Sequence, residues 1–286
     1  CCFLTIIKKK VYELLLMVEL RNKCKFGEAN VNVFLSTLTL YYKECERFLR
    51  VGQQTILSPL VSISLFYIVF SISIGNDRPN VLGVSFTTFL LPGLIAMNCL
   101  QASFAHSSSS ILMGKIMQTI YSDIISTPLE AKEVVLAIVL ASVTRSFLIA
   151  ITCIIGFSFF VDIKIYNYLY LFIFLFFGSF ILGCAGFLGG CAIEKFDGMS
   201  AITNFVLLPA TFMSGTFFTI QILNPVLQKI CEFNPFWYMI MGTRMAFIGK
   251  ADGSILTGII YLSVLSIILF FCCIIAYQKG WKNLKQ

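Results

Sequence analysis

Few side chains in this sequence could carry out chemistry, and those few form no catalytic pattern. The one histidine, His106, stands beside the run Ser107 to Ser110 and has no second histidine with which to form a dyad or a metal cluster. The eleven cysteines include no C-x-x-C motif, and most lie within apolar stretches. Cysteines in such places are typically small apolar fillers, although disulfides remain possible. The sequence predicts no catalytic residue, no metal site and no cofactor bound by this chain.

Any source of chemical energy is expected to lie outside these 286 residues. They contain no G-x-x-x-x-G-K-S/T motif, the P-loop that cradles the phosphates of ATP. The 14 acidic residues lie almost wholly outside the apolar stretches, which argues against a carrier that relays protons through intramembrane carboxylates. The chain is therefore expected not to be an enzyme, and to depend on a second protein or an ion gradient.

The composition is that of a membrane protein. The chain is 58% hydrophobic and 12% charged, with a mean hydropathy of +0.89, whereas a soluble domain is about a quarter charged. This excludes a water-soluble enzyme, a disordered protein and a disulfide-stapled secreted domain. The apolar residues form runs long enough to cross a hydrocarbon layer of about 30 Å as helices, and they do not alternate as barrel strands do. The sequence predicts an all-α, polytopic membrane protein.

Six transmembrane helices are predicted, and the basic residues orient them. The side that carries both termini holds fifteen of the 21 lysines and arginines, and the opposite side holds five. Basic loops stay on the cytoplasmic side, so both termini are expected to be cytoplasmic. The net charge of +7 is better explained by this topology and by anionic lipid than by nucleic acid. The predicted spans are residues 56–75, 86–105, 134–161, 166–193, 201–222 and 255–277.

Arg145 is the remaining basic residue and lies within the third predicted span. A cation at the centre of a bilayer costs about 2.5–3.5 kcal/mol on insertion scales. One interpretation places Arg145 near the cytoplasmic boundary, where its guanidinium can snorkel to water. The other has it facing a polar cavity or a partner subunit.

An amphipathic helix is predicted at residues 36–55, before the first span. Leu38, Tyr41, Cys45 and Phe48 recur at helical spacing on one face, which is typical of a helix that lies along a membrane surface. Its mixed charge favours contact with a cytoplasmic partner, and the alternative is a simple anchor for the first span. The polar residues of this interface helix are Lys43, Glu44, Arg47, Arg50 and Gln54.

A rigid elbow is predicted between the second and third spans. Met113, Met117, Ile120 and Ile124 form a helical stripe, and this helix must end by Thr127, since proline disfavours helical geometry in the residue before it. Thr127, Pro128 and Glu130 then fit the N-cap, N1 and N3 positions of the next helix. Such an elbow could carry a push from a cytoplasmic protein into a span, or it could be an ordinary loop. Its candidate residues are Gly114, Lys115, Met117, Ile120, Asp123, Ile124, Thr127, Pro128 and Glu130.

Two further patterns concern packing and the outer surface. In the fourth span, Ser179, Gly183, Gly186 and Gly190 form a small-residue stripe, which favours close helix packing in lipid over a transport pathway. Residues 224–254 are too apolar for a free loop, and prolines split them into pieces shorter than a span. These pieces are predicted to be short interfacial or re-entrant helices between spans five and six, with Trp237 and Tyr238 at headgroup depth.

Residues 35–286 resemble the permease subunits of type 2 ATP-binding cassette (ABC-2) exporters of the bacterial inner membrane. The resemblance rests on FLRVGQQTILSPLVSISLFYIVF, FLLPGLIAMN, SSSSILMGKIMQTIYSDIISTPLEAKEVVLA, EKFDGMSAITNFVLLPATFMSGTFF and ICEFNPFWYMIMGTRMAFIG, in this order. Residues 1–34 have no counterpart in the family and are treated as an N-terminal extension. The residues from Ile120 to Asp123 lack the adjacent glutamates that the elbow often carries in the family.

The resemblance implies a permease that works as a pair, a homodimer in the simplest case, and binds two copies of a cytoplasmic nucleotide-binding ATPase. ATP and Mg²⁺ would bind to that partner. The interface helix and the elbow would contact it, and a hydrophobic, drug-like, lipid-linked or polysaccharide cargo would move outward. The alternative is a gradient-driven carrier or channel, which would need an ion site or an inverted repeat that the sequence does not show. A membrane-embedded enzyme or assembly scaffold is a third class, and it lacks the clustered polar residues that chemistry needs.

Overall fold

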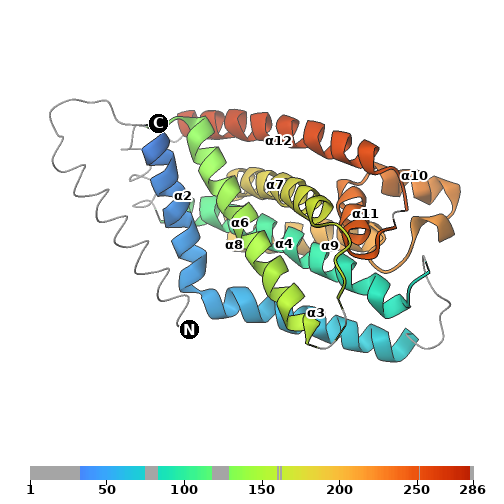
Figure 1. Cartoon of the computed structure of the whole chain (residues 1–286). Helices are drawn as coiled ribbons and strands as arrows, with labels where there is room; N and C mark the ends of the chain where they lie inside the picture. Colours follow the sequence, from blue (N-terminus) through green and yellow to red (C-terminus); the bar gives the residue numbers. More distant parts are fainter. Residues whose placement is uncertain are drawn as a thin grey trace.

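The fold is a bundle of α-helices (Figure 1). The computed structural model describes residues 33–74, 83–117, 129–159, 161, 163–250 and 252–283. The predicted extension 1–34 lies almost entirely outside this part. In chain order the helices are α2 (Val33–Arg50), α3 (Gly52–Ile74), α4 (Phe86–Ile116), α6 (Ala131–Ser158), α7 (Tyr168–Ala192), α8 (Phe196–Ile202), the π-helix η1 (Thr203–Leu207), α9 (Leu208–Met213), the 3-10 helix η2 (Ile220–Ile222), α10 (Pro225–Phe233), α11 (Pro235–Ile248) and α12 (Ile255–Asn283).

Within the described residues, five helices are long and apolar enough to cross a membrane: α3, α4, α6, α7 and α12. They correspond to five of the six predicted spans, so the prediction of a polytopic α-helical membrane protein is confirmed. The helix α4 continues without a break to Ile116, beyond residue 105 where the second span was predicted to end.

The remaining predicted span, 201–222, is not one regular helix. The elements α8, η1 and α9 follow one another without a gap from Phe196 to Met213, and the last predicted residues form a turn and η2. Pro209 explains the π-helical turn, because it has no N–H to offer the carbonyl of Phe205 and its ring crowds that carbonyl. Such π-turns occur mostly as single turns within α-helices. The helix ends where Ser214 and Thr216 donate their hydroxyls to the carbonyl of Thr211, at 2.5 and 2.8 Å.

The core of the bundle is built from α4, α6 and α7, which are mostly buried. In the apolar windows of these helices 72%, 61% and 56% of the residues are buried, whereas the share is 11% in α3 and 17% in α12. Figure 1 shows α3 and α12 on opposite sides of the core helices. These two helices therefore present the surfaces that lipid or another protein must cover.

Small residues bring α4 and α7 into close contact. Ser103 of α4 donates its hydroxyl to the carbonyl of Ser179 at 2.6 Å, and a Cβ added to Gly186 would overlap the carbonyl of Phe104. A Cβ added to Gly190 would lie 2.8 Å from the side chain of Ile111. The stripe thus lets two backbones approach closely, as small residues do between helices in lipid.

The helix α2 lies across one end of the bundle (Figure 1), which we call the α2 end. Its Leu40 and Phe48 are buried, and Leu40 packs with Val134 and Cys273 of α6 and α12. The predicted helix 36–55 is too long at its C-terminal end, because α2 ends at Arg50 and the chain turns into α3 at Gly52. A buried contact holds this corner, since Thr55 donates its hydroxyl to the carbonyl of Phe48 at 3.2 Å. Gln54 consequently lies in the first turn of α3.

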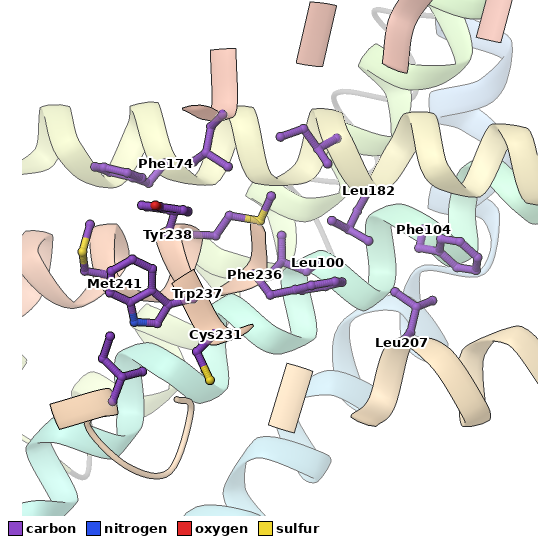
Figure 2. Close-up of a cluster of buried hydrophobic side chains, with 14 of the residues drawn as sticks. Leu100, Phe104, Phe174, Leu182, Leu207, Cys231, Phe236, Trp237, Tyr238 and Met241 are labelled. Carbon is purple, nitrogen blue, oxygen red and sulfur yellow. The ribbon is translucent and has the colours of Figure 1, made fainter. Parts of the chain in front are cut away.

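The helix α11 fills the opposite end, which we call the α11 end. Figure 2 shows its aromatic and sulfur side chains packed against α4 and α7. Its 14 residues span about 21 Å, too short to cross a bilayer. Trp237 and Tyr238 are 5% and 9% exposed, so they pack against protein, and their place at headgroup depth stays a prediction. Protein covers this non-spanning segment, as its backbone requires at membrane depth.

Candidate functional site

The predicted elbow begins in the last turn of α4, where Lys115 caps a neighbouring helix. Its Nζ donates to the carbonyls of Cys191 and Ile193 at 2.5 and 3.2 Å. These carbonyls end α7, and a cation is favourable there because it meets unpaired carbonyls and the negative end of the helix dipole. Gly114 also lies in this turn and Met117 is the C-cap. The elbow residues Ile120, Asp123, Ile124, Thr127 and Pro128 lie outside the described residues.

The start of α6 differs from its prediction by three positions. The N-cap is Glu130 and the helix begins at Ala131, so Glu130 does not occupy N3. Glu133 takes that position, and its carboxylate accepts the backbone N–H of Glu130 at 3.0 Å. The pair Glu130 and Glu133 can thus form the reciprocal pattern of a capping box. The predicted cap at Thr127 was therefore wrong.

The polar residues of the interface helix α2 divide into two groups. Lys43 and Arg50 are exposed, and Arg50 pairs with Glu46 at 3.0 Å. Glu44 and Arg47 instead form an ion pair at 2.9 Å between Glu44 Oε2 and Arg47 Nη2. Both turn toward α4. The amphipathic pattern of the sequence did not predict this contact.

His106 of α4 is the residue that Glu44 and Arg47 hold. Arg47 Nη2 donates to the backbone carbonyl of His106 at 3.2 Å and lies 3.5 Å from its Nδ1. The carboxylate of Glu44 lies 3.5 Å from Nε2 on the other side of the ring, and Phe48 packs edge-on against the ring with centroids 5.5 Å apart. The imidazole is 1% exposed. These contacts fasten α2 to α4 at His106, about 15 Å of helix before α4 ends at Ile116.

The rate at which the thiol of Cys45 in α2 is modified measures how closely this helix is packed. Burial raises the pKa of Cys45 to about 11, although a hydrogen bond with Tyr41 opposes the shift. Because the thiolate is the reactive form, we expect N-ethylmaleimide to modify Cys45 about three hundred times more slowly at pH 7.4 than an ordinary thiol of pKa about 8.5. Peptide mass spectrometry over time gives the rate. A cysteine introduced by Lys43→Cys on the exposed side of the same helix is the control, and equal rates at the two positions would contradict this packing.

Arg244 of α11 organises the other end of the bundle. Its Nη2 donates to the carbonyls of Gly215 and Thr216 at 2.5 and 2.9 Å, and its Nη1 lies 3.6 Å from Asp252 Oδ2. The guanidinium also sits 3.7 Å from the centre of the Phe89 ring in the first turns of α4, a favourable cation–π distance. The side chains of Arg244 and Asp252 are 3% and 2% exposed. This buried anchor joins α4, the turn after α9, α11 and the segment before α12.

Arg244 is one of the five basic residues on the side opposite the termini, and its role in an anchor was not predicted. The signal that could have found it is the arginine itself, since an ionised side chain in an apolar segment requires a partner, and Asp252 is the acidic residue that follows it most closely in the chain. Among the described residues, no group of three or more His, Cys, Asp or Glu is placed to hold a metal ion. The contacts at the two ends of the bundle hold helices together and can transmit movement between them.

Comparison with known proteins gives one consistent result. The profile of the family described as "ABC-2 type transporter" matches residues 36–248. The "Inner membrane transport permease YadH" of Escherichia coli strain K12 is 28% identical over 242 residues, which cover 85% of this chain and 94% of the relative. The permease of the same name from Shigella flexneri is similar to the same extent. The matched residues reach from α2 to the end of α11.

Proposed function

Because this chain belongs to the ABC-2 type transporter family and is a permease subunit of that kind, we propose that it moves its cargo outward through a bacterial inner membrane. An ATPase encoded as a separate chain drives this movement, and ATP and Mg²⁺ bind to that ATPase. The family profile covers most of the chain, and the relatives are inner membrane transport permeases by name. Outward transport and the separate energy source follow from the family resemblance and from the lack of a P-loop in these 286 residues.

The proposed topology has six crossings, with α8, η1 and α9 together as the fifth. Near the start of α8, Ile193 accepts a hydrogen bond from Lys115 at the α2 end. Beyond the end of α9, Gly215 accepts one from Arg244 at the α11 end. The segment from Phe196 to Met213 therefore runs the length of the bundle, and its length of about 27 Å fits a hydrocarbon layer of about 30 Å. Six crossings put both termini at the α2 end, which is the cytoplasmic side by its basic residues.

The α2 end is the surface that receives the ATPase. The observation that carries this proposal is that α2 and the end of α4 meet there and are tied to the membrane helices by specific contacts. Arg47 and Glu44 hold α2 to His106, and Lys115 holds the end of α4 to the end of α7. A displacement imposed on this surface reaches α4 and α7 together. Two ATPase subunits and two permeases complete the assembly in this proposal.

The pathway for cargo lies between two copies of the permease. The faces of α3 and α12 are the largest uncovered surfaces, and the exposed face of α3 carries Gln54, Ser58 and Ser62, which are unfavourable against lipid. The apolar windows of α4, α6 and α7 are mostly buried, which favours a pathway outside this core. A hydrophobic, drug-like, lipid-linked or polysaccharide cargo fits this arrangement, whereas a gradient-driven carrier would need its own ion site.

The proposal is tested by purifying the tagged permease together with its ATPase. We expect the ATPase to co-purify, and we expect a cysteine placed at Ile120 in the elbow to resist membrane-impermeant maleimide in intact cells. Labelling of that cysteine from outside would overturn the orientation. Transport in vesicles that contain no cassette ATPase would overturn the energy source.

Replacing Lys115 is expected to uncouple the ATPase from the membrane helices. Lys115→Gln removes the charge that bonds the carbonyls of Cys191 and Ile193, and such charge-assisted bonds contribute about 1.5–3 kcal/mol each. In the wild-type complex, ATP with vanadate should change deuterium uptake at residues 189–199. We expect the variant to bind the ATPase but to lose this change. Lys229→Gln, an exposed lysine of α10, is the matched control, and an unaltered response in Lys115→Gln would rule out this route of coupling.

A further inference from the structure

Arg145 is a half-buried cation that has no counter-charge in the described part of the chain. The ion pairs found there involve other basic residues: Arg47, Arg50, Lys132, Arg244 and His106. The nearest charge that acts on Arg145 is the like charge of Arg47. Its Nε is buried and has no hydrogen-bond partner among the described residues. A cation in this position requires a negative group from elsewhere.

The surroundings of Arg145 also offer more donors than acceptors. Arg47 of α2 contacts His106 of α4, and Tyr41 of α2 hydrogen-bonds Thr144, the residue before Arg145 in α6, at 2.7 Å, so this corner lies between α2, α4 and α6. Arg47 Nε and His106 Nε2 are buried and make no hydrogen bond within the described residues. The carboxylate of Glu44 is already shared between Arg47 and His106, at 2.9 and 3.5 Å. The corner therefore holds two guanidinium groups and one carboxylate, whose Oε2 is also buried without a hydrogen bond in the described part of the chain, and one positive charge is left over.

Two more unsatisfied polar groups lie on the same stretch of α4. Gln101 Nε2 and Ser107 Oγ are buried without a hydrogen-bond partner among the described residues, and Ser107 is 0% exposed. The stretch lies against α6 close to Arg145, because Ser146 donates its hydroxyl to the carbonyl of Cys99 at 2.6 Å. Buried polar groups are normally satisfied, so the unsatisfied nitrogens of Arg145 and Arg47 indicate a missing partner at this corner.

The geometry points to a phosphate group as this partner, and we propose that Arg145, with Arg47, binds the phosphate of a phosphate ester at the α2 end of the bundle. A phosphate oxygen is anionic and accepts several hydrogen bonds, and the planar guanidinium of arginine fits it with two parallel bonds. The corner lies beside the amphipathic helix α2, at the depth where lipid headgroups meet the protein. The phosphate can come from an anionic membrane lipid or from a soluble phosphate ester. This site goes beyond the proposed function and does not depend on it.

The test measures binding of phosphatidylglycerol to the purified full-length permease by native mass spectrometry. We expect Arg145→Gln to weaken binding about tenfold, because the charge-assisted pair is lost. Arg145→Lys keeps the charge but not the planar fork, so its affinity should lie between those of the wild type and Arg145→Gln. Arg50→Gln is the matched control, since Arg50 is an exposed arginine of the same corner, and it should change the affinity less than about twofold.

A second measurement guards against a variant that simply folds poorly. Phosphatidylglycerol added to the wild-type protein in neutral detergent should raise its melting temperature, because a ligand that binds only the folded state stabilises it. Arg145→Met should fold in lipid-free detergent and lose this rise. If Arg145→Met and Arg145→Gln keep wild-type affinity and the same rise, the site does not exist.

The source of the phosphate is decided by competition. Inorganic phosphate and glycerol 3-phosphate are added at millimolar concentration to the lipid-bound permease. Displacement of the lipid by these probes, with the same loss in Arg145→Gln, identifies a site for soluble phosphate esters. Lipid binding that resists both probes and still requires Arg145 identifies a lipid headgroup site. Binding of lipid and soluble probes that is unaffected by Arg145→Gln overturns the proposal.

Discussion

Gly186→Ala is expected to disrupt the contact between α4 and α7 and to destabilise the permease by about 3 kcal/mol, the upper part of the range for overpacked cores. The added methyl group would overlap the carbonyl of Phe104, and its distances to the Phe104 carbonyl carbon and Cα would both be 3.0 Å. These are backbone atoms, which cannot move aside as the end of a flexible side chain can. Unfolding in mixed micelles with increasing sodium dodecyl sulfate measures the loss.

The chain offers a matched control one turn away on the same helix. A Cβ on Gly189 would lie 3.6 Å from the ring of Phe104 and 3.7 Å from Met199, which is ordinary van der Waals contact. Gly189→Ala should therefore leave stability unchanged or raise it by up to about 1 kcal/mol, since alanine favours the helix. Similar unfolding midpoints for the two variants would contradict the close approach of the two backbones.

Arg244→Met is expected to cost about 3–5 kcal/mol, the usual penalty for removing one partner of a buried ion pair. The change leaves the carboxylate of Asp252 buried without its cation, and it leaves the carbonyls of Gly215 and Thr216 without a donor. The double variant Arg244→Met with Asp252→Asn should recover part of the loss, because the uncompensated charge is gone. Lys164→Met, at an exposed position, is the control and should change stability by less than about 0.5 kcal/mol.

The loss in Arg244→Met should also depend on pH, with a sign set by Asp252. Burial raises the pKa of Asp252, and the nearby guanidinium of Arg244 opposes that rise. Without Arg244 the pKa rises further above its value in the unfolded chain, so the folded state binds the proton more tightly. Such a group stabilises the fold below the unfolded pKa, and this stabilisation is lost as the pH rises through the folded pKa. The variant should thus be weakest at neutral pH and approach the wild type as the pH falls, and a deficit that grows toward acid pH would contradict this.

The features that follow from bilayer thickness and periodicity were predictable from the sequence. Five of the membrane helices match apolar stretches, because crossing about 30 Å demands about 20 apolar residues whatever the neighbours are. The helical spacing of its apolar residues made the amphipathic helix α2 predictable as well. Its end was placed too late, since Gly52 can continue a helix or permit a corner and the buried contact of Thr55 decides between them.

The features that depend on partners far along the chain were not predictable. Arg47 has the spacing of a solvated residue, yet it turns to His106, which is 59 positions away. Arg244 gives no local sign of the carbonyls at Gly215 and Thr216 that hold it. The two interpretations of Arg145 could not be separated by hydropathy, because both keep the guanidinium out of lipid. Pro209 indicates an irregular turn in this segment, but the exact form of the turn depends on the packing around it.

The length of α4 has a mechanical consequence. This one helix of 31 residues measures about 46 Å, and it carries Phe89 under the anchor at one end and Lys115 at the other. Between these ends, the carbonyl of Phe104 is pressed against Gly186, which serves as a fulcrum. A rigid helix that pivots at this contact would tilt toward the centre at one face of the membrane and away from it at the other.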